Sequence, residues 1–219
     1  TPREHRRRYL QTVLSQSPDF KPGTRAQYSN AGYVVLGAVL EQLYQEEWEQ
    51  LARRMLFQPL GMTSAGFGPM ASPDKVDQPW QHRKEGNNKV ALGASPLADN
   101  APVLGPAGRV HCSLIDWAKF IQAHLPSAQQ RRRLVKPATL ERMHTPIGNQ
   151  VFGMGWLVVE RDWAGGKALT HAGSNTLSYA VVWVAPRKNS AVMVATNQGG
   201  TEAQSGTDQA CARIIREFF

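Results

Sequence analysis

The feature that most constrains the fold is a change in hydrophobic spacing part-way along the chain. In residues 30–44 the apolar side chains recur every three to four positions, which predicts a helix with one buried face. After residue 151 the apolar residues form short runs rich in Val, Trp and Tyr, separated by turn residues, which predicts strands. The sequence therefore predicts an α+β fold. The expected buried helix face consists of Tyr33, Leu36, Val39, Leu40 and Leu43.

The second part of the chain predicts an antiparallel sheet covered by a helix. The expected strands are residues 152–160, 179–185 and 190–196, and the last two form a hairpin. Residues 201–219 then place apolar side chains on one helical face, which predicts a terminal helix lying across the sheet. That face carries Ala210, Ile214, Ile215 and Phe218.

Two more helices are expected in the first part of the chain. One covers residues 46–57 and stops at Pro59, because proline interrupts helical hydrogen bonding. The other begins at Ser113, which has capping-box spacing to Asp116. Its expected apolar face carries Leu114, Trp117, Ile121 and Leu125. Residues 62–107, rich in Gly, Pro, Asn and Asp, predict an irregular connection with short strands.

The length predicts one domain, with residues 1–150 mainly helix and loop and residues 151–219 forming the sheet and the terminal helix. The apolar runs are too short to span a bilayer, which takes about 18–20 residues, and the first residues show no secretory signal. The two cysteines, Cys112 and Cys211, exclude a disulfide framework, and one disulfide or two free thiols fit equally well.

The net charge of +8 comes partly from two arginine runs, Arg6–Arg8 and Arg131–Arg133. Such runs suit an anionic polymer, but a solvated helix face is the favoured interpretation. Aromatic residues are not interleaved with either run, and no zinc-finger, RNP-type or helix-turn-helix signature is present. We therefore expect no nucleic-acid partner, and no metal or cofactor.

Two short stretches have side chains suited to catalysis. The phenol of Tyr28 suits a proton shuttle and the amide of Asn30 suits substrate orientation, but for the triplet alone a turn entering a helix is the favoured interpretation. In the second stretch, His171 offers a hydrogen-bonding or positive group. Gly173 would let a substrate backbone approach, and the Ser174 backbone N–H would serve as an oxyanion donor.

The order of seven short segments resembles the serine β-lactamase and penicillin-binding-protein superfamily, most closely class C β-lactamases, DD-peptidases, D-aminopeptidases and esterases. The resemblance runs from about Phe20 to the final helix. The segments are Phe20-x-Pro22-Gly23, Tyr28-Ser29-Asn30-x-Gly32-Tyr33, Pro59-Leu60-Gly61-Met62, Pro106-Ala107-Gly108, Asp116-x-Ala118-x-Phe120, Gly153-Met154-Gly155-Trp156 and His171-Ala172-Gly173.

The resemblance implies a β-lactamase/transpeptidase-like fold and a site built from three motifs. Tyr28 and Asn30 would match the family's Tyr-x-Asn, and His171, Ala172 and Gly173 the strand triad, with Ser174 supplying an oxyanion N–H. Histidine replaces the lysine of Lys-Thr-Gly, so a permanent positive charge for a substrate carboxylate is not assured. This replacement is more similar to DD-peptidases, D-aminopeptidases and esterases than to efficient β-lactamases.

The third motif, Ser-x-x-Lys, is not found before Tyr28, where the family has it. One formal match, Ser72-Pro73-Asp74-Lys75, lies downstream in a polar, irregular segment. The resemblance therefore implies that the chain is the C-terminal portion of the fold, with the nucleophile on a missing N-terminal segment of the same protein.

The expected function is that of part of a serine hydrolase forming an acyl-enzyme on a β-lactam, a D-amino-acid peptide or a small ester, the chain alone being inactive. The alternative is a non-catalytic protein of the same fold that binds peptidoglycan-like ligands. Possible substrate contacts in residues 62–107 are Trp80, His82 and Arg83, for which plain surface exposure fits equally well. The resemblance favours a periplasmic or exported protein.

Overall fold

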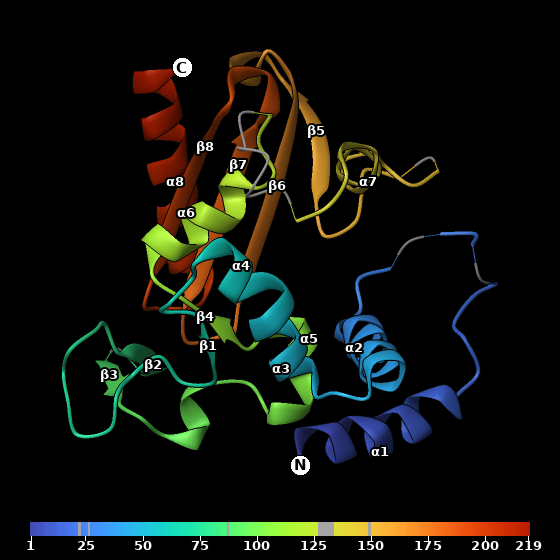
Figure 1. Ribbon diagram of the computed structural model, residues 1–219. Coiled ribbons are helices and arrows are strands. Elements are labelled where there is room, and N and C mark those ends of the chain that lie inside the picture. Colours follow the sequence, from blue (N-terminus) through green and yellow to red (C-terminus); the bar gives the residue numbers. More distant parts are fainter. Residues whose placement is uncertain (22, 26, 87, 127–133, 149) are drawn as a thin grey trace.

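Figure 1 shows the computed structural model, which describes residues 1–219 except 22, 26, 87, 127–133 and 149. Pro22 and the run Arg131–Arg133 lie outside the described residues. The main sheet is antiparallel, with strand order β5-β6-β7-β8. Its strands are β5 (Leu157–Arg161), β6 (Gly166–Ser174), β7 (Tyr179–Ala185) and β8 (Ser190–Thr196). The predicted α+β arrangement, the antiparallel sheet and the β7–β8 hairpin are confirmed.

The first strand of the sheet begins later than its hydrophobic run predicts. The run starts at Phe152, but β5 starts at Leu157, and Phe152 forms an isolated bridge to Leu157. Between them the Gly153 backbone N–H donates to the Trp156 carbonyl at 2.8 Å, and Gly155 has a φ of +79°. Glycine adopts this left-handed backbone conformation without strain, and the conformation lets the chain turn back on itself before β5 starts.

Helices cover both faces of the sheet (Figure 1), since alternate residues of a strand point to opposite sides. On one side, α6 (Leu114–Gln122) contributes to the largest core cluster. That cluster contains Ile121, Leu125, Trp156, Val158, Leu169, Val182 and Val184. On the other side, Val181 and Val192 pack against Cys211 of α8 (Thr201–Phe218). The predicted covering helix is confirmed.

Two side chains expected on buried helix faces are exposed instead. Phe218 is 72% exposed because the buried stripe of α8 follows Ala203, Thr207 and Cys211. The ring of its neighbour Phe219 contacts the indole of Trp163 edge-on. In α6 the predicted N-cap is confirmed, since the Ser113 side chain accepts from the Asp116 N–H. The first turn of α6 buries Asp116 rather than Leu114.

The first part of the chain is helical, as predicted, and includes an N-terminal helix that the hydrophobic pattern did not predict. Its elements are α1 (Pro2–Leu14), α2 (Asn30–Tyr44), α3 (Trp48–Ala52), the π-helix η1 (Arg53–Phe57) and α4 (Gln58–Leu60). Pro59 lies inside α4 and does not end the helix, contrary to the prediction. The π-helical turn before it changes the hydrogen-bond spacing, and Gly61, in the left-handed region, ends α4.

The face of α2 that is buried is not the face that the sequence predicts. The structure buries Val34, Gly37 and Glu41, whereas Leu36 is 58% and Leu43 is 71% exposed. Gly37 is buried because α5 (Gly105–Gly108) lies against it: a Cβ at Gly37 would be 2.3 Å from Pro106. The apolar face that periodicity selected therefore has no cover among the described residues.

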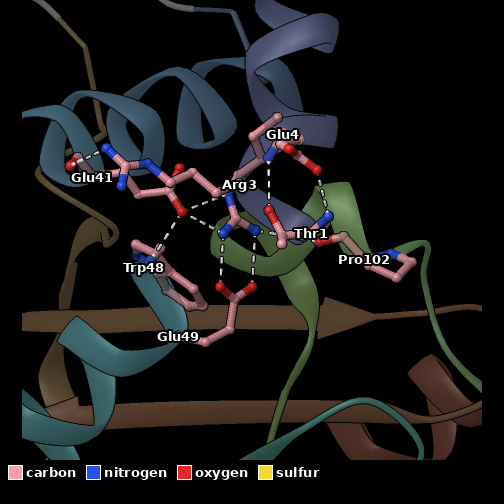
Figure 2. Close-up of polar contacts among 8 residues, drawn as sticks. Thr1, Arg3, Glu4, Glu41, Trp48, Glu49 and Pro102 are labelled. Atoms are coloured by element: carbon pink, nitrogen blue, oxygen red, sulfur yellow. Dashed lines mark hydrogen bonds and ion pairs between the residues drawn. The ribbon is translucent and has the colours of Figure 1, made fainter. Parts of the chain in front are cut away.

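Arg6 is fully buried, which corrects the prediction of a solvated arginine run. Its guanidinium donates to Glu41 Oε1 at 2.5 Å and to Glu49 Oε2 at 2.7 Å. Glu41 also accepts from the Trp48 backbone N–H, and Figure 2 shows the two carboxylates and Trp48 around this network. Arg7 and Arg8 are exposed, as expected of a solvated face. The network joins α1 to α2 and α3.

Residues 62–107 form the irregular connection with short strands that was predicted. Two small two-stranded sheets involve this segment: β1 (Gly66–Phe67) pairs with β4 (Val110–His111), and β2 (Gln81–Glu85) with β3 (Asn88–Leu92). The remaining short helices are η2 (Pro96–Ala98), η3 (Pro102–Leu104), α7 (Pro137–Met143), η5 (Asp162–Ala164) and η6 (Pro186–Lys188). Within the described ranges, no helix has the length and apolar character that crossing a membrane requires.

Both cysteines are free thiols, which decides between the two alternatives left open by the sequence. Burial raises the pKa of Cys112 to about 11, with a further contribution from the Asp116 charge. Burial likewise raises the pKa of Cys211 to about 11. Neither thiol is therefore activated as a nucleophile.

Candidate active site

Tyr28 and Asn30 lie together at the start of α2. Ser29 is the N-cap of this helix, and its hydroxyl accepts from the Gly32 backbone N–H at 3.2 Å. The Tyr28 hydroxyl donates to Asn30 Oδ1 at 2.8 Å. The cap explains why the two side chains are neighbours, because it fixes the direction of the chain where it enters the helix. The phenol is 85% exposed, so the pair is open to solvent.

His171, Ala172, Gly173 and Ser174 lie at the end of β6, where pairing on one side has stopped. The last β5–β6 pair is Leu157 with Thr170, whereas β6 stays paired with β7 through Ser174. The strand is thus central in the sheet (Figure 1), but on the β5 side its last four residues pair with no strand among the described residues. A Cβ at Gly173 would meet no atom within 4 Å, so the approach that the sequence analysis expected there is sterically open.

A set of polar contacts holds the turn that follows β6. The Ser174 hydroxyl donates to the Ser178 carbonyl at 2.6 Å. Asn175 Oδ1 accepts from the Ser178 backbone N–H at 3.0 Å, and Asn175 Nδ2 donates to Asp99 Oδ1 at 3.0 Å. Asp99 also pairs with Arg109 at 3.3 Å. No local sequence pattern marks Asn175 or Asp99, because only folding brings these two side chains into contact.

Gly155 connects the two motif-bearing elements. His171 Nδ1 lies 2.7 Å from the Gly155 carbonyl oxygen. A Cβ at Gly155 would lie 3.8 Å from the hydroxyl of Tyr33, which is on α2 beyond Tyr28 and Asn30. Among the described residues no hydrogen bond joins Tyr28 or Asn30 directly to His171. The two motifs therefore approach each other through Gly155 and Tyr33, both of which lie in segments that carried the family resemblance.

A buried histidine pair supports the loop that contains Gly155. His124 Nδ1 and His144 Nε2 lie 2.9 Å apart, and both rings contact the indole of Trp156 edge-on. Burial, and then the charge of the neighbouring His144, lowers the pKa of His124 to about 4. Burial also lowers the pKa of His144. The Met154 backbone N–H donates to the Met143 carbonyl at 3.0 Å, which attaches the loop to the end of α7.

The formal Ser-x-x-Lys match does not have the structure of a nucleophile motif. Residues 72–75 form a turn in which the Lys75 N–H lies 3.5 Å from the Ser72 carbonyl, and Asp74 has a φ of 57°. The Ser72 hydroxyl accepts from Gln78 at 3.4 Å. Because the family motif places its serine at a helix N-terminus, this turn is not equivalent to it.

The side chains considered as substrate contacts in residues 62–107 have structural partners. The Trp80 indole N–H donates to the Lys75 carbonyl at 3.2 Å, and His82 Nδ1 lies 3.2 Å from the Asn197 carbonyl. Arg83 forms an ion pair with Glu85. In the part of the chain that the structure describes, no cluster of three or more His, Cys, Asp or Glu side chains is placed to hold a metal ion.

Comparison with known proteins identifies the family. Residues 2–213 match the model of the β-lactamase family. The chain belongs to the β-lactamase family. It is 26% identical over 219 aligned positions to penicillin-binding protein 4 of Amycolatopsis lactamdurans, covering 92% of this chain and 54% of that protein. The chain thus spans about half the length of this curated relative.

Solved structures agree with the family assignment at the level of the fold. The structure of SurE aligns with a TM-score of 0.78 and 21% identity, covering 96% of this chain and 49% of that one. A D-stereospecific amidohydrolase from Streptomyces aligns with a TM-score of 0.72 and 19% identity, covering 96% of this chain and 60% of that one. The β-lactamase/transpeptidase-like fold inferred from the sequence motifs is therefore confirmed. Members of this β-lactamase family are serine hydrolases.

Proposed function

We propose that this chain forms the Tyr-x-Asn and His-x-Gly part of an acyl-transfer site in a serine hydrolase that cleaves an amide or ester. The substrate would be a β-lactam, a D-amino-acid peptide or a small ester. The observation that carries the proposal is the convergence of α2 and the free end of β6 at Gly155. Names of similar proteins, penicillin-binding protein 4 and a D-stereospecific amidohydrolase, support this substrate class.

The proposed roles follow from the functional groups and their surroundings. The serine oxygen would bond to the substrate carbonyl carbon and lose its proton, for which the Tyr28 hydroxyl, hydrogen-bonded to Asn30, is the shuttle. As the bond to the leaving amine or alcohol breaks, that group takes up a proton. Water then hydrolyses the ester and restores the serine. The unpaired backbone edge at Gly173 and Ser174 would hold the substrate and its developing oxyanion.

The nucleophile in this proposal comes from a part of the protein outside these 219 residues. Two observations support this. Tyr28, the proposed shuttle, is 85% exposed, although such a group works in a site closed to water. The apolar face of α2, on which Leu36 and Leu43 lie, has no cover among the described residues. A Ser-x-x-Lys helix from the same reading frame would supply both the nucleophile and the cover.

Covalent labelling tests the proposal. The 219-residue chain and the same chain with its upstream coding region are each treated with a reporter penicillin and a fluorophosphonate. Intact mass and peptide mapping then locate any adduct. We expect an adduct only in the longer protein, on the serine of an upstream Ser-x-x-Lys. An adduct on Ser72, or on another serine of this chain, would contradict the assignment.

Substitution of the proton shuttle sharpens this experiment. In the longer protein, Tyr28→Phe should slow acylation by about 10²–10⁴-fold, because a general acid–base catalyst is lost. Tyr44→Phe is the matched control, since Tyr44 lies at the other end of the same helix. If the 219-residue chain and the longer protein both bind peptidoglycan-like ligands but neither is ever acylated, the alternative of a non-catalytic binding protein replaces the proposal.

A further inference from the structure

The His171 ring has one hydrogen-bond partner in the described part of the chain. This partner is the Gly155 carbonyl oxygen, 2.7 Å from Nδ1. A carbonyl oxygen can accept a hydrogen bond but has no proton to donate, so Nδ1 must carry the hydrogen. We infer that Gly155 is a positioning residue that holds His171 in the Nδ1-protonated tautomer and leaves Nε2 for the substrate. This inference rests on the proposed function for its catalytic meaning, but the tautomer does not depend on it.

The conformation of Gly155 makes this contact specific to glycine. Its φ of +79° lies in the left-handed region, where side chains with a Cβ are strained. Space is not the obstacle, because a Cβ there would meet the Tyr33 hydroxyl at 3.8 Å, an ordinary contact. A substitution at Gly155 would therefore act by rotating the backbone, and with it the carbonyl that faces His171.

The strand geometry explains why a loop carbonyl is needed here. β5 supports β6 as far as Thr170, the partner of Leu157, and the ladder stops one residue before His171. The Gly155 carbonyl, two residues before β5, contacts the imidazole of His171 rather than pairing with the strand backbone. The loop is closed by the hydrogen bond from the Gly153 N–H to the Trp156 carbonyl, and the Met154 N–H attaches it to the Met143 carbonyl of α7.

The tautomer determines what Nε2 can recognise. In the neutral ring with a hydrogen on Nδ1, Nε2 is an acceptor and suits an N–H or O–H group of the substrate. In the protonated ring both nitrogens donate, so Nε2 then suits a substrate carboxylate, while the bond to Gly155 is kept in both states. The Gly155 contact thus keeps the same nitrogen available in either charge state.

Nitrogen NMR of the histidine-labelled protein tests the inference without any substrate. Long-range ¹H–¹⁵N correlations distinguish a pyrrole-type from a pyridine-type nitrogen in each ring. For neutral His171 we expect pyrrole-type Nδ1 and pyridine-type Nε2. His111 is an internal reference, because its Nδ1 also lies near a carbonyl oxygen, that of Gly68, at 2.9 Å. A pyrrole-type Nε2 at His171 in the unsubstituted protein would overturn the inference.

The variant Gly155→Ala tests whether this carbonyl is responsible. We expect it to abolish the Nδ1–H preference of His171 and to leave His111 unchanged, which also reports that the protein is folded. Gly148→Ala is the matched control, because Gly148 has a φ of +61° and no neighbour within 4 Å of its Cβ position. An unchanged His171 tautomer in folded Gly155→Ala protein would contradict the positioning role.

Activity gives a separate readout in the protein that carries the upstream segment. There Gly155→Ala should lower the acylation rate on the order of 10- to 100-fold, since a misplaced group loses its orientation, and Gly148→Ala should not. A protein that shows the expected tautomer but never acylates would refute the proposed function alone. A wrong tautomer in an acylating protein would refute this inference alone.

Discussion

The histidine pair beneath Trp156 is the residue-scale feature with the clearest energetic consequence. His124 and His144 are both buried, and each satisfies the other through the 2.9 Å contact between their rings. This bond needs a hydrogen on only one of the two facing nitrogens, so it forms when both rings are neutral. Protonation of either neutral ring would place a positive charge in the core beside Trp156.

This pair predicts a loss of stability in mild acid. Burial, and then the charge of His144, lowers the pKa of His124 from 6.5 to about 4. The unfolded state therefore takes up protons before the folded state does. Stability should be complete above pH 6.5 and decrease as the pH falls toward 4. Between pH 8 and pH 5 we expect the free energy of unfolding to fall by about 2 kcal/mol in urea titrations.

A variant assigns this pH dependence to the pair. His124→Phe keeps an aromatic ring against Trp156 but removes the titrating group, so the fall between pH 8 and pH 5 should become shallower. His5→Gln is the control, because His5 is exposed. Asp116 titrates in a separate window: its hydrogen bonds from Lys119, and then from Ser64, lower its pKa to about 2. An unchanged slope in His124→Phe would show that another group is responsible.

At the scale of elements, an ionic network attaches α1 to α3 and to α2, the helix at whose start the candidate active-site pair lies. Arg6 of α1 reaches Glu41 of α2 and Glu49 of α3, and it also lies 3.4 Å from the Pro102 carbonyl. Burial acts to lower the pKa of the guanidinium, but the hydrogen bonds to Glu49 and Glu41 outweigh it and raise the pKa. The ion is therefore charged and paired in the folded state.

Removing one partner of this network should be costly. Arg6→Met leaves the buried Glu41 carboxylate and the partly buried Glu49 carboxylate without their cation, and we expect it to lower the free energy of unfolding by about 3–5 kcal/mol. Arg7→Met is the matched control in the next position, where the side chain is exposed, and it should change stability by less than about 0.5 kcal/mol. Equal effects of the two substitutions in urea unfolding would refute the structural role of Arg6.

At the scale of the whole molecule, α2 has one covered and one uncovered side. Val34 on the covered side is fully buried, while Leu43 on the other side is 71% exposed. A helix that is apolar on both sides is normally buried on both. In the 219-residue chain, Val34→Ala should cost about 2 kcal/mol, whereas Leu43→Gln should stay within about 0.5 kcal/mol.

The same substitution reports whether a longer protein covers this face. With the upstream region present, Leu43→Gln should become destabilising by an amount comparable to that of Val34→Ala, because the leucine is then removed from a core. Arg8→Gln, at an exposed position of α1, is a control for general surface effects. If Leu43→Gln is neutral in both proteins, α2 is not covered by the upstream region.

Local patterns predicted the elements because period and turn chemistry are properties of neighbouring residues. The helix at 30–44, the cap at Ser113 and the hairpin of β7 and β8 are all recovered in the structure. The motifs also placed Tyr28 and Asn30 at the start of a helix and His171 on a strand, as the structure has them. Local order in the chain is sufficient for these features.

Tertiary contacts decided which faces are buried and how the site is assembled. Among the described residues, the covered side of α2 is not the side that periodicity selects, because Pro106 lies against Gly37 and Arg6 binds the buried Glu41. Periodicity likewise could not pair His171 with Gly155, since that contact crosses the β5–β6 hairpin and depends on where β5 begins. The family and the kinds of elements follow from the order of residues along the chain. The packing of segments distant in the chain determined burial, partners and tautomer, because those depend on which surfaces meet.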